Sequence, residues 1–143
     1  MSTEISFIVI DDSELDSFVT KKAIEYTDKS LNIKTFDNAQ HALDSIRKNH
    51  SGENSNISTI ILLDLQMPLM NGFEFVEEFE QFPPEVQKKY MIIVLTILTS
   101  KRHPNDIYRI LNHSAVNRII EKPFTKEKLL SLLVELNSNT FKK

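Results

Sequence analysis

The chain has 143 residues, of which 41% are apolar, and this is enough for one domain with a sizeable core. Its 17 Lys and Arg residues against 20 Asp and Glu residues give a formal net charge of −3, so we expect no direct binding to nucleic acid. The sequence has no cysteine, which excludes disulfides, thiolate zinc ligands and cysteine nucleophiles and suits a cytoplasmic protein.

The N-terminal segment carries no recognisable targeting signal. Residues 1–6 lack a basic stretch, and the apolar run at residues 7–10 is too short for a signal peptide or a membrane span. No linker, low-complexity tract or internal repeat interrupts the rest of the chain. We therefore expect one domain over residues 1–143, with no second folded domain and no contact with a membrane.

Apolar runs recur along the chain and predict five strands. They lie at residues 7–10, 31–36, 57–63, 91–98 and 118–120. Three of these runs are nearly continuous in Ile, Val and Leu, which is typical of parallel strands that are buried on both faces. The run at 31–36 instead alternates between apolar and polar residues, which predicts a more peripheral strand.

The segments between these runs have helical periodicity. Ser13 is a typical N-cap for the first helix, whose apolar residues follow the i, i+3, i+4 rule, and Asn38 caps the second helix. Three further helices are expected at about residues 72–80, ending before Pro83-Pro84, at about 105–111 and at 125–137. This alternation predicts a doubly wound α/β fold, in which five helices flank a sheet of five parallel strands.

Several familiar motifs are missing. The two glycines, Gly52 and Gly72, lie twenty positions apart, so neither a dinucleotide fingerprint nor a P-loop can be present. None of the four histidines has the HExxH spacing of the common zinc enzymes. These classes of site are therefore excluded.

Charged residues follow three of the predicted strands. Asp11 and Asp12 follow the first strand, Asp64 ends the third, and Lys122 follows the fifth. The carboxyl ends of parallel strands share one edge of the sheet, so we expect these side chains to meet there. Three carboxylates repel one another unless a cation joins them, and Mg²⁺ suits such an oxygen-rich site.

Asp64 is the predicted nucleophile. It comes directly after a buried apolar strand, which holds its carboxylate rigidly at the edge of the sheet. A carboxylate in that place can attack phosphorus and form an aspartyl phosphate, while Mg²⁺ and Lys122 neutralise the phosphoryl oxygens. The sequence thus predicts phosphoryl transfer to Asp64.

These residues carry a resemblance to a known family. Asp11-Asp12, the segment LDLQMPLMNGFEF at residues 63–75, and Glu121-Lys122-Pro123-Phe124 resemble a response-regulator receiver domain from end to end. The resemblance implies a flavodoxin-like sheet with the strand order 2-1-3-4-5. The segments at 82–85 and 104–106 further resemble stand-alone receivers of the Bacteroidetes type.

The resemblance also implies roles for individual residues. Asp64 matches the phosphoacceptor, and Lys122 matches the lysine that pairs with the phosphoryl group, followed by a cis peptide bond. The implied Mg²⁺ ligands are Asp12 directly, Asp11 through water, Asp64, and the backbone carbonyl of Gln66.

The family resemblance implies the partners as well. The phosphoryl group comes from a phosphohistidine on a sensor histidine kinase or a histidine phosphotransfer protein. We expect the chain to pass the signal on by docking to an unknown downstream protein, in the cytoplasm. A receiver catalyses its own phosphorylation and slow dephosphorylation, so we do not expect an enzyme that turns over a substrate.

Two residues match the hydroxyl that the family carries at the end of its fourth strand. Counting forward from Asp64 without a gap favours Thr96, whereas counting back from Lys122 favours Thr99. The small Ser100 after Thr99 suits a position beside a phosphoryl group, whereas Ile97 after Thr96 is bulky. We therefore choose Thr99 as the predicted switch hydroxyl, with Thr96 as the alternative.

Two departures from the family pattern affect signalling. Ile119 stands where the family usually has an aromatic residue that reorients on phosphorylation. Asn117 stands in for the usual glycine before the fifth strand, and asparagine can adopt a left-handed backbone conformation at modest cost.

Three alternative functions follow from the sequence. The chain could be a degenerate receiver used as a scaffold, although its full set of acidic residues and Lys122 argues against this. It could be a phosphate sink that drains a kinase without signalling onward. A haloacid-dehalogenase-type phosphatase would need an acidic residue two positions after its nucleophile, where this chain has Gln66.

Overall fold

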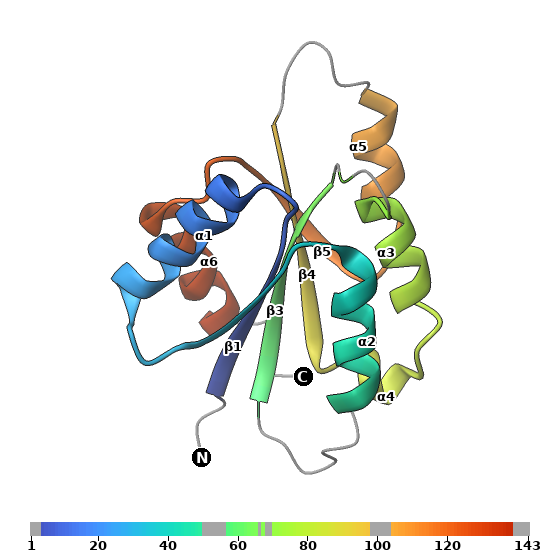
Figure 1. Ribbon diagram of the computed structural model, residues 1–143, viewed down its shortest axis with the longest axis horizontal. Helices are drawn as coiled ribbons and strands as arrows, with labels where there is room; N and C mark the ends of the chain where they lie inside the picture. Colours follow the sequence, from blue (N-terminus) through green and yellow to red (C-terminus); the bar gives the residue numbers. More distant parts are fainter. Residues whose placement is uncertain (1–3, 50–56, 66, 68–69, 98–103, 139–143) are drawn as a thin grey trace.

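The computed structural model describes residues 4–49, 57–65, 67, 70–97 and 104–138. Its strands form one parallel sheet in the order β2-β1-β3-β4-β5, which confirms the predicted doubly wound topology (Figure 1). The strand that was expected to be peripheral, β2, lies at an edge of this sheet. The strand bounds are Glu4–Ile10 for β1, Asn32–Phe36 for β2, Ile57–Asp64 for β3, Tyr90–Thr96 for β4 and Val116–Glu121 for β5.

Helices cover both faces of the sheet. α1 and α6 lie side by side on one face, and α2, α3, α4 and α5 lie on the other (Figure 1). Within the described part of the chain, no helix is long and apolar enough to cross a membrane. The helix bounds are Glu14–Thr27 for α1, Ala39–Asn49 for α2, Gly72–Phe79 for α3, Pro84–Gln87 for α4, Pro104–Leu111 for α5 and Lys126–Ser138 for α6.

The central strand β3 shows why the sheet is buried on both sides. Ile61 and Leu63 pack into the core beneath α2 and α3, while Ile60 and Leu62 pack into the core beneath α1 and α6. All four side chains are fully buried. A strand in this position needs apolar residues at successive positions, which accounts for the continuous apolar run in the sequence.

The strand register aligns the ends of the central strands. Ile10 of β1 pairs with Leu63 of β3, so the next residues along, Asp11 and Asp64, are neighbours. Asp64 in turn pairs with Leu95 of β4. The pairing of the strands therefore brings residues far apart in the sequence to one edge of the sheet.

Among the residues that the structure describes there are six helices, whereas the sequence predicted five. A sixth, short helix, α4, begins at Pro84, directly where the third helix was expected to end. Proline is tolerated in the first turn of a helix because its missing N–H would have no partner there. Val86 of α4 is buried in the core, and the Gln87 side chain donates hydrogen bonds to the carbonyls of Glu80 and Phe82.

The end of β4 and the start of β5 also differ from the sequence prediction. β4 ends at Thr96, before the end of the apolar run, and Ile97 is exposed. Asn117 lies inside β5 as an extra residue between two pairs of the β4–β5 ladder, and no non-glycine residue that the structure describes has a positive φ. Asn117 therefore does not use the left-handed conformation that asparagine can adopt, because a bulge accommodates the residue instead.

Glu80, directly after α3, ties that helix to the segment between α5 and β5. Its Oε1 lies 2.9 Å from Nδ1 of His113, and its Oε2 accepts a hydrogen bond of 3.2 Å from the Ala115 backbone N–H. Arg109 of α5 also lies over the ring of Phe73 in α3, 4.1 Å from its centroid. These contacts hold α5 and the segment after it against α3 as well as against the sheet.

Gly72 brings the start of α3 against the end of β3. Its N–H donates a hydrogen bond of 2.9 Å to the Leu65 carbonyl, and a Cβ at this position would lie 2.9 Å from the Leu65 Cα and 3.1 Å from the Asp64 carbonyl oxygen. Since these are backbone atoms, a side chain could enter only if the strand end or the helix shifted. The close approach requires glycine.

Replacing Gly72 tests this contact. Glycine to alanine in a helix normally stabilises a protein by up to about 1 kcal/mol. Here Gly72→Ala should lower the free energy of unfolding by about 1–3 kcal/mol, because the added methyl group overpacks the strand end. Urea denaturation measures the change, and Ser131→Ala on the exposed face of α6 is the control, expected within about 0.5 kcal/mol of wild type. A stabilised Gly72→Ala would contradict the close approach.

Candidate functional site

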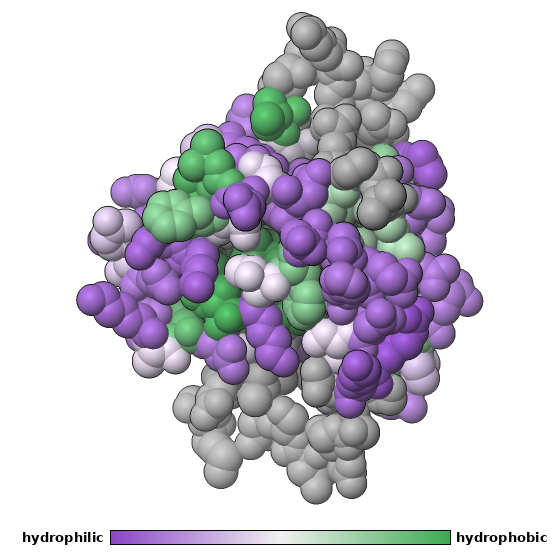
Figure 2. All heavy atoms as spheres, in the orientation of Figure 1, coloured by the Kyte–Doolittle hydropathy of each residue, from purple (hydrophilic) through white to green (hydrophobic). Residues whose placement is uncertain are grey.

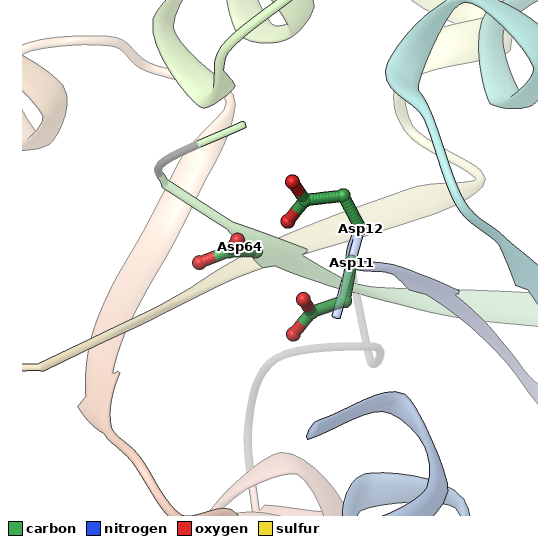
Figure 3. A group of neighbouring side chains, drawn as sticks. All are labelled: Asp11, Asp12 and Asp64. Atoms are coloured by element: carbon green, nitrogen blue, oxygen red, sulfur yellow. The ribbon is translucent and has the colours of Figure 1, made fainter. Parts of the chain in front are cut away.

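Three carboxylates meet beyond the carboxyl ends of β1 and β3. One oxygen each from Asp11, Asp12 and Asp64 lies within 4.8 Å of the others, and the three groups turn toward the same side of the strand ends (Figure 3). Asp11 and Asp64 are buried, with 3% and 7% exposure, whereas Asp12 is exposed. Carboxylate oxygens at this spacing can hold a hard divalent cation such as Mg²⁺.

The loop after β1 fixes the first of these groups. Asp11 donates its backbone N–H to the Phe36 carbonyl of β2, and its Oδ1 accepts a hydrogen bond of 2.9 Å from the Ser13 N–H. The Ser13 side chain in turn caps α1 by accepting from the Asp16 N–H, as predicted for this N-cap. The same few residues therefore begin the helix and orient the Asp11 carboxylate.

Lys122 is the cation of the site. Its Nζ lies 3.1 Å from Asp11 Oδ2, 3.1 Å from Asp64 Oδ1 and 2.9 Å from Asp16 Oδ2, and its side chain is 12% exposed. The backbone N–H of Lys122 donates to the Thr96 carbonyl at 2.8 Å, and the predicted cis peptide bond to Pro123 is confirmed. The end of β5 thus delivers the ammonium group into the carboxylate cluster.

Burial and neighbouring charges shift the pKa values of Asp11 and Lys122 in opposite directions. Burial raises the pKa of Asp11, although the Ser13 hydrogen bond and the Lys122 charge oppose the rise. Burial alone would lower the pKa of Lys122, but the hydrogen bond to Asp16 and the charges of Asp64 and Asp11 outweigh it and raise that pKa. Lys122 therefore stays an ammonium group, while the ionised form of Asp11 remains costly.

Asp16 is the member of the cluster that the sequence analysis missed. Its position one helical turn after Asp12 is the signal that could have placed it at the same edge of the sheet. The Asp16 side chain is 41% exposed, whereas those of Asp11 and Asp64, the other two partners of Lys122, are 2% and 9% exposed.

Thr96 contributes a hydroxyl near this edge. It is 1% exposed, and among the described residues its Oγ1 is the buried side-chain atom without a hydrogen-bond partner. Thr96 follows Leu95, the β4 partner of Asp64. The other two predicted site residues, Gln66 and Thr99, lie outside the described residues.

The arrangement suits attack by Asp64 on an anionic electrophile. The structure brings together Asp11, Asp12, Asp64 and Lys122 from the predicted set. An ammonium group beside the nucleophile, and a cation held by the carboxylates, would offset the charge that a phosphoryl group brings.

Known proteins of one family resemble this chain in sequence and fold. A family model described as "Response regulator receiver domain" matches residues 7–134. A crystal structure of a response regulator receiver protein from Dyadobacter fermentans is 30% identical and has a TM-score of 0.78, with 92% of this chain and 96% of that chain covered. A two-component response regulator from Cytophaga hutchinsonii, 22% identical with a TM-score of 0.79, has the same fold over 96% of this chain and all of that one (100%).

A curated relative is much longer. The autoinducer 1 sensor kinase/phosphatase LuxN of Vibrio campbellii is 25% identical over 134 residues, which cover 93% of this chain but only 14% of LuxN. The likeness therefore concerns one part of that protein. With its sheet order, its carboxylate cluster and a family match over nearly its whole length, the chain belongs to the response regulator receiver domain family.

Proposed function

We propose that Asp64 is the phosphoacceptor of this receiver and that its phosphoryl group comes from a phosphohistidine. The observation that carries the proposal is the setting of Asp64. Its carboxylate is buried at the end of β3, 3.1 Å from the Lys122 ammonium group and beside Asp11 and Asp12. A structural role would not require three carboxylates at one strand edge.

In the proposed step, a carboxylate oxygen of Asp64 attacks the phosphorus and forms a P–O bond. The P–N bond of the phosphohistidine breaks, and its electron pair stays on the imidazole nitrogen of the donor. Lys122 donates a hydrogen bond to a phosphoryl oxygen. Mg²⁺, held by Asp11, Asp12, Asp64 and the Gln66 carbonyl, would supply further positive charge to the transferred group.

The surface of α1 suits a helical kinase or phosphotransfer partner. Leu15, Phe18 and Val19 are exposed on α1, and Figure 2 shows apolar side chains over this helix within a largely hydrophilic surface. A cleft of about 530 Å³ beside α1 includes Asp12 and Phe18 in its walls. A donor histidine docked over α1 would therefore be close to the carboxylate cluster.

For the output we propose phosphorylation-dependent docking at the face formed by α5, β5 and α6. Tyr108 and Leu111 of α5 are exposed there, with 69% and 46% exposure. Ile119 is partly buried against the core, and it cannot act as an aromatic rotamer switch. This substitution favours a phosphate sink as the second candidate function.

The switch hydroxyl has two candidates. The sequence spacing to Lys122 supports Thr99, which remains a prediction. Two observations support Thr96: its buried hydroxyl is unpartnered among the described residues, and its carbonyl accepts the Lys122 N–H. A phosphoryl oxygen would give that hydroxyl the acceptor it otherwise lacks.

Intact-mass analysis tests the phosphoacceptor. After incubation with Mg²⁺ and acetyl phosphate, the wild-type chain should gain one phosphoryl mass that is lost at alkaline pH, as an acyl phosphate must be. Asp64→Asn should gain none, because the amide is a poor nucleophile. Asp37→Asn, an exposed acid beyond the end of β2, is the matched control and should label like wild type. Equal labelling of Asp64→Asn and wild type would refute the assignment.

Thermal melting tests the cation site. Mg²⁺ should stabilise the wild-type chain, by about 1.4 kcal/mol at ten times its dissociation constant. Asp12→Asn should lose most of this effect, because it removes the exposed carboxylate of the cluster, yet it should be no less stable than wild type without metal, since repulsion also falls. Asp37→Asn should respond to Mg²⁺ as wild type does. If Asp12→Asn kept the full response, Asp12 would not be a ligand.

Hydrogen exchange distinguishes the two threonines and tests the output. With Mg²⁺ and fluoroberyllate, a stable phosphoryl analogue, exchange in α5 should change in the wild-type chain, since a signal requires two states with different surfaces. Thr96→Ala should abolish the change, and Thr99→Ala should retain it. The reverse pattern would assign the switch to Thr99, and a wild-type α5 without any change would favour the phosphate sink.

A further inference from the structure

The contact between Asp16 and Lys122 is not explained by the proposed phosphoryl transfer. Asp16 lies in the first turn of α1, and its Oδ2 is 2.9 Å from Lys122 Nζ, whereas the contacts to Asp11 and Asp64 are 3.1 Å. Asp16 is not in the group of carboxylates placed to share a cation. Its partner at this edge is the ammonium group itself.

An ammonium group has three N–H donors and no acceptor. In this structure Lys122 Nζ donates hydrogen bonds to Asp11 Oδ2 and Asp16 Oδ2, and it forms an ion pair with Asp64 Oδ1 at 3.1 Å. Two of its donors are therefore engaged by Asp11 and Asp16, and the Asp64 carboxylate lies beside it as an ion pair. A phosphoryl group on Asp64 brings several new acceptor oxygens, which compete with these carboxylates for the ammonium group.

The three partners differ in how easily they can leave. The side chains of Asp11 and Asp64 are only 2% and 9% exposed, and each is fixed at the end of a central strand. The Asp16 side chain is 41% exposed on a helix, so its carboxylate can turn into water and be solvated there. Asp16 is thus the partner that Lys122 can exchange at the lowest cost.

We propose that Asp16 is a latch on Lys122, a positioning residue that holds the ammonium group in the unphosphorylated state and competes with the phosphoryl oxygens for it. The inference rests on the proposed function, because it needs a phosphoryl group on Asp64. The latch lowers the affinity of the site for phosphoryl oxygens and so limits how much of the receiver is in the phosphorylated-like state at a given phosphodonor supply.

Titration with fluoroberyllate and Mg²⁺ tests the latch without any turnover. Asp16→Asn keeps the shape of the side chain but removes its charge, so it should bind the analogue about fivefold more tightly than wild type. Asp16→Glu restores the charge on a longer side chain and should return the affinity to within about twofold of wild type. Because Asp16 is partly exposed, both variants should fold, and a melting curve checks this.

A matched control separates the latch from a general effect of charge. Glu14 is exposed in the same helical turn, and among the described residues it has no ion pair. Glu14→Gln therefore removes one negative charge near the site without touching Lys122, and its affinity for fluoroberyllate should stay within about twofold of wild type. An equal gain in Glu14→Gln and Asp16→Asn would overturn the latch in favour of net charge.

The remaining outcomes distinguish the two hypotheses. If the wild-type chain and all variants fail to bind fluoroberyllate with Mg²⁺, the proposed phosphoacceptor function is wrong. If wild type binds and Asp16→Asn binds equally or more weakly, the phosphoacceptor assignment stands and the latch is refuted.

Discussion

The architecture of this site depends on the contacts between the Lys122 ammonium group and the surrounding carboxylates. The pairing of β1 with β3 brings Asp11 and Asp64 to one edge of the sheet, and burial makes the ionised form of Asp11 costly. Without a positive charge among them, the strand ends would be pushed apart or the carboxylates protonated. The fold therefore carries an internal counter-ion that keeps the site assembled before any cation or phosphoryl group arrives.

Much of this could be predicted from the sequence because parallel sheets impose strong constraints. Strands buried on both faces give continuous apolar runs, and their carboxyl ends share an edge, so the residues after each run had to be neighbours. That reasoning, together with the family resemblance, found the topology and the grouping of Asp11, Asp12, Asp64 and Lys122. It depends on where β1 and β3 end, which the apolar runs predicted; the end of β4 was predicted too late, because its apolar run continues past Thr96.

The features that the sequence analysis missed depend on tertiary packing and strand register, which the pattern of residue types does not encode. Pro84 is compatible with either the end of a helix or the first turn of another, and the packing of Val86 decides between them. Asp16 has the same sequence signature whether it faces solvent or Lys122, since only the orientation of α1 on the sheet selects its partner. The extra residue at Asn117 likewise becomes visible only through the register of β4 with β5.

The Glu80 contacts determine how α5 can move. Because Glu80 holds His113 and the Ala115 backbone, the C-terminal end of α5 is anchored to α3, and Arg109 adds a second attachment one turn earlier. A displacement of α5 that keeps these contacts would rotate the helix about this end and would not slide it as a whole. In such a rotation the largest movement would fall at the N-terminal end of α5, near the edge of the sheet where the carboxylates lie.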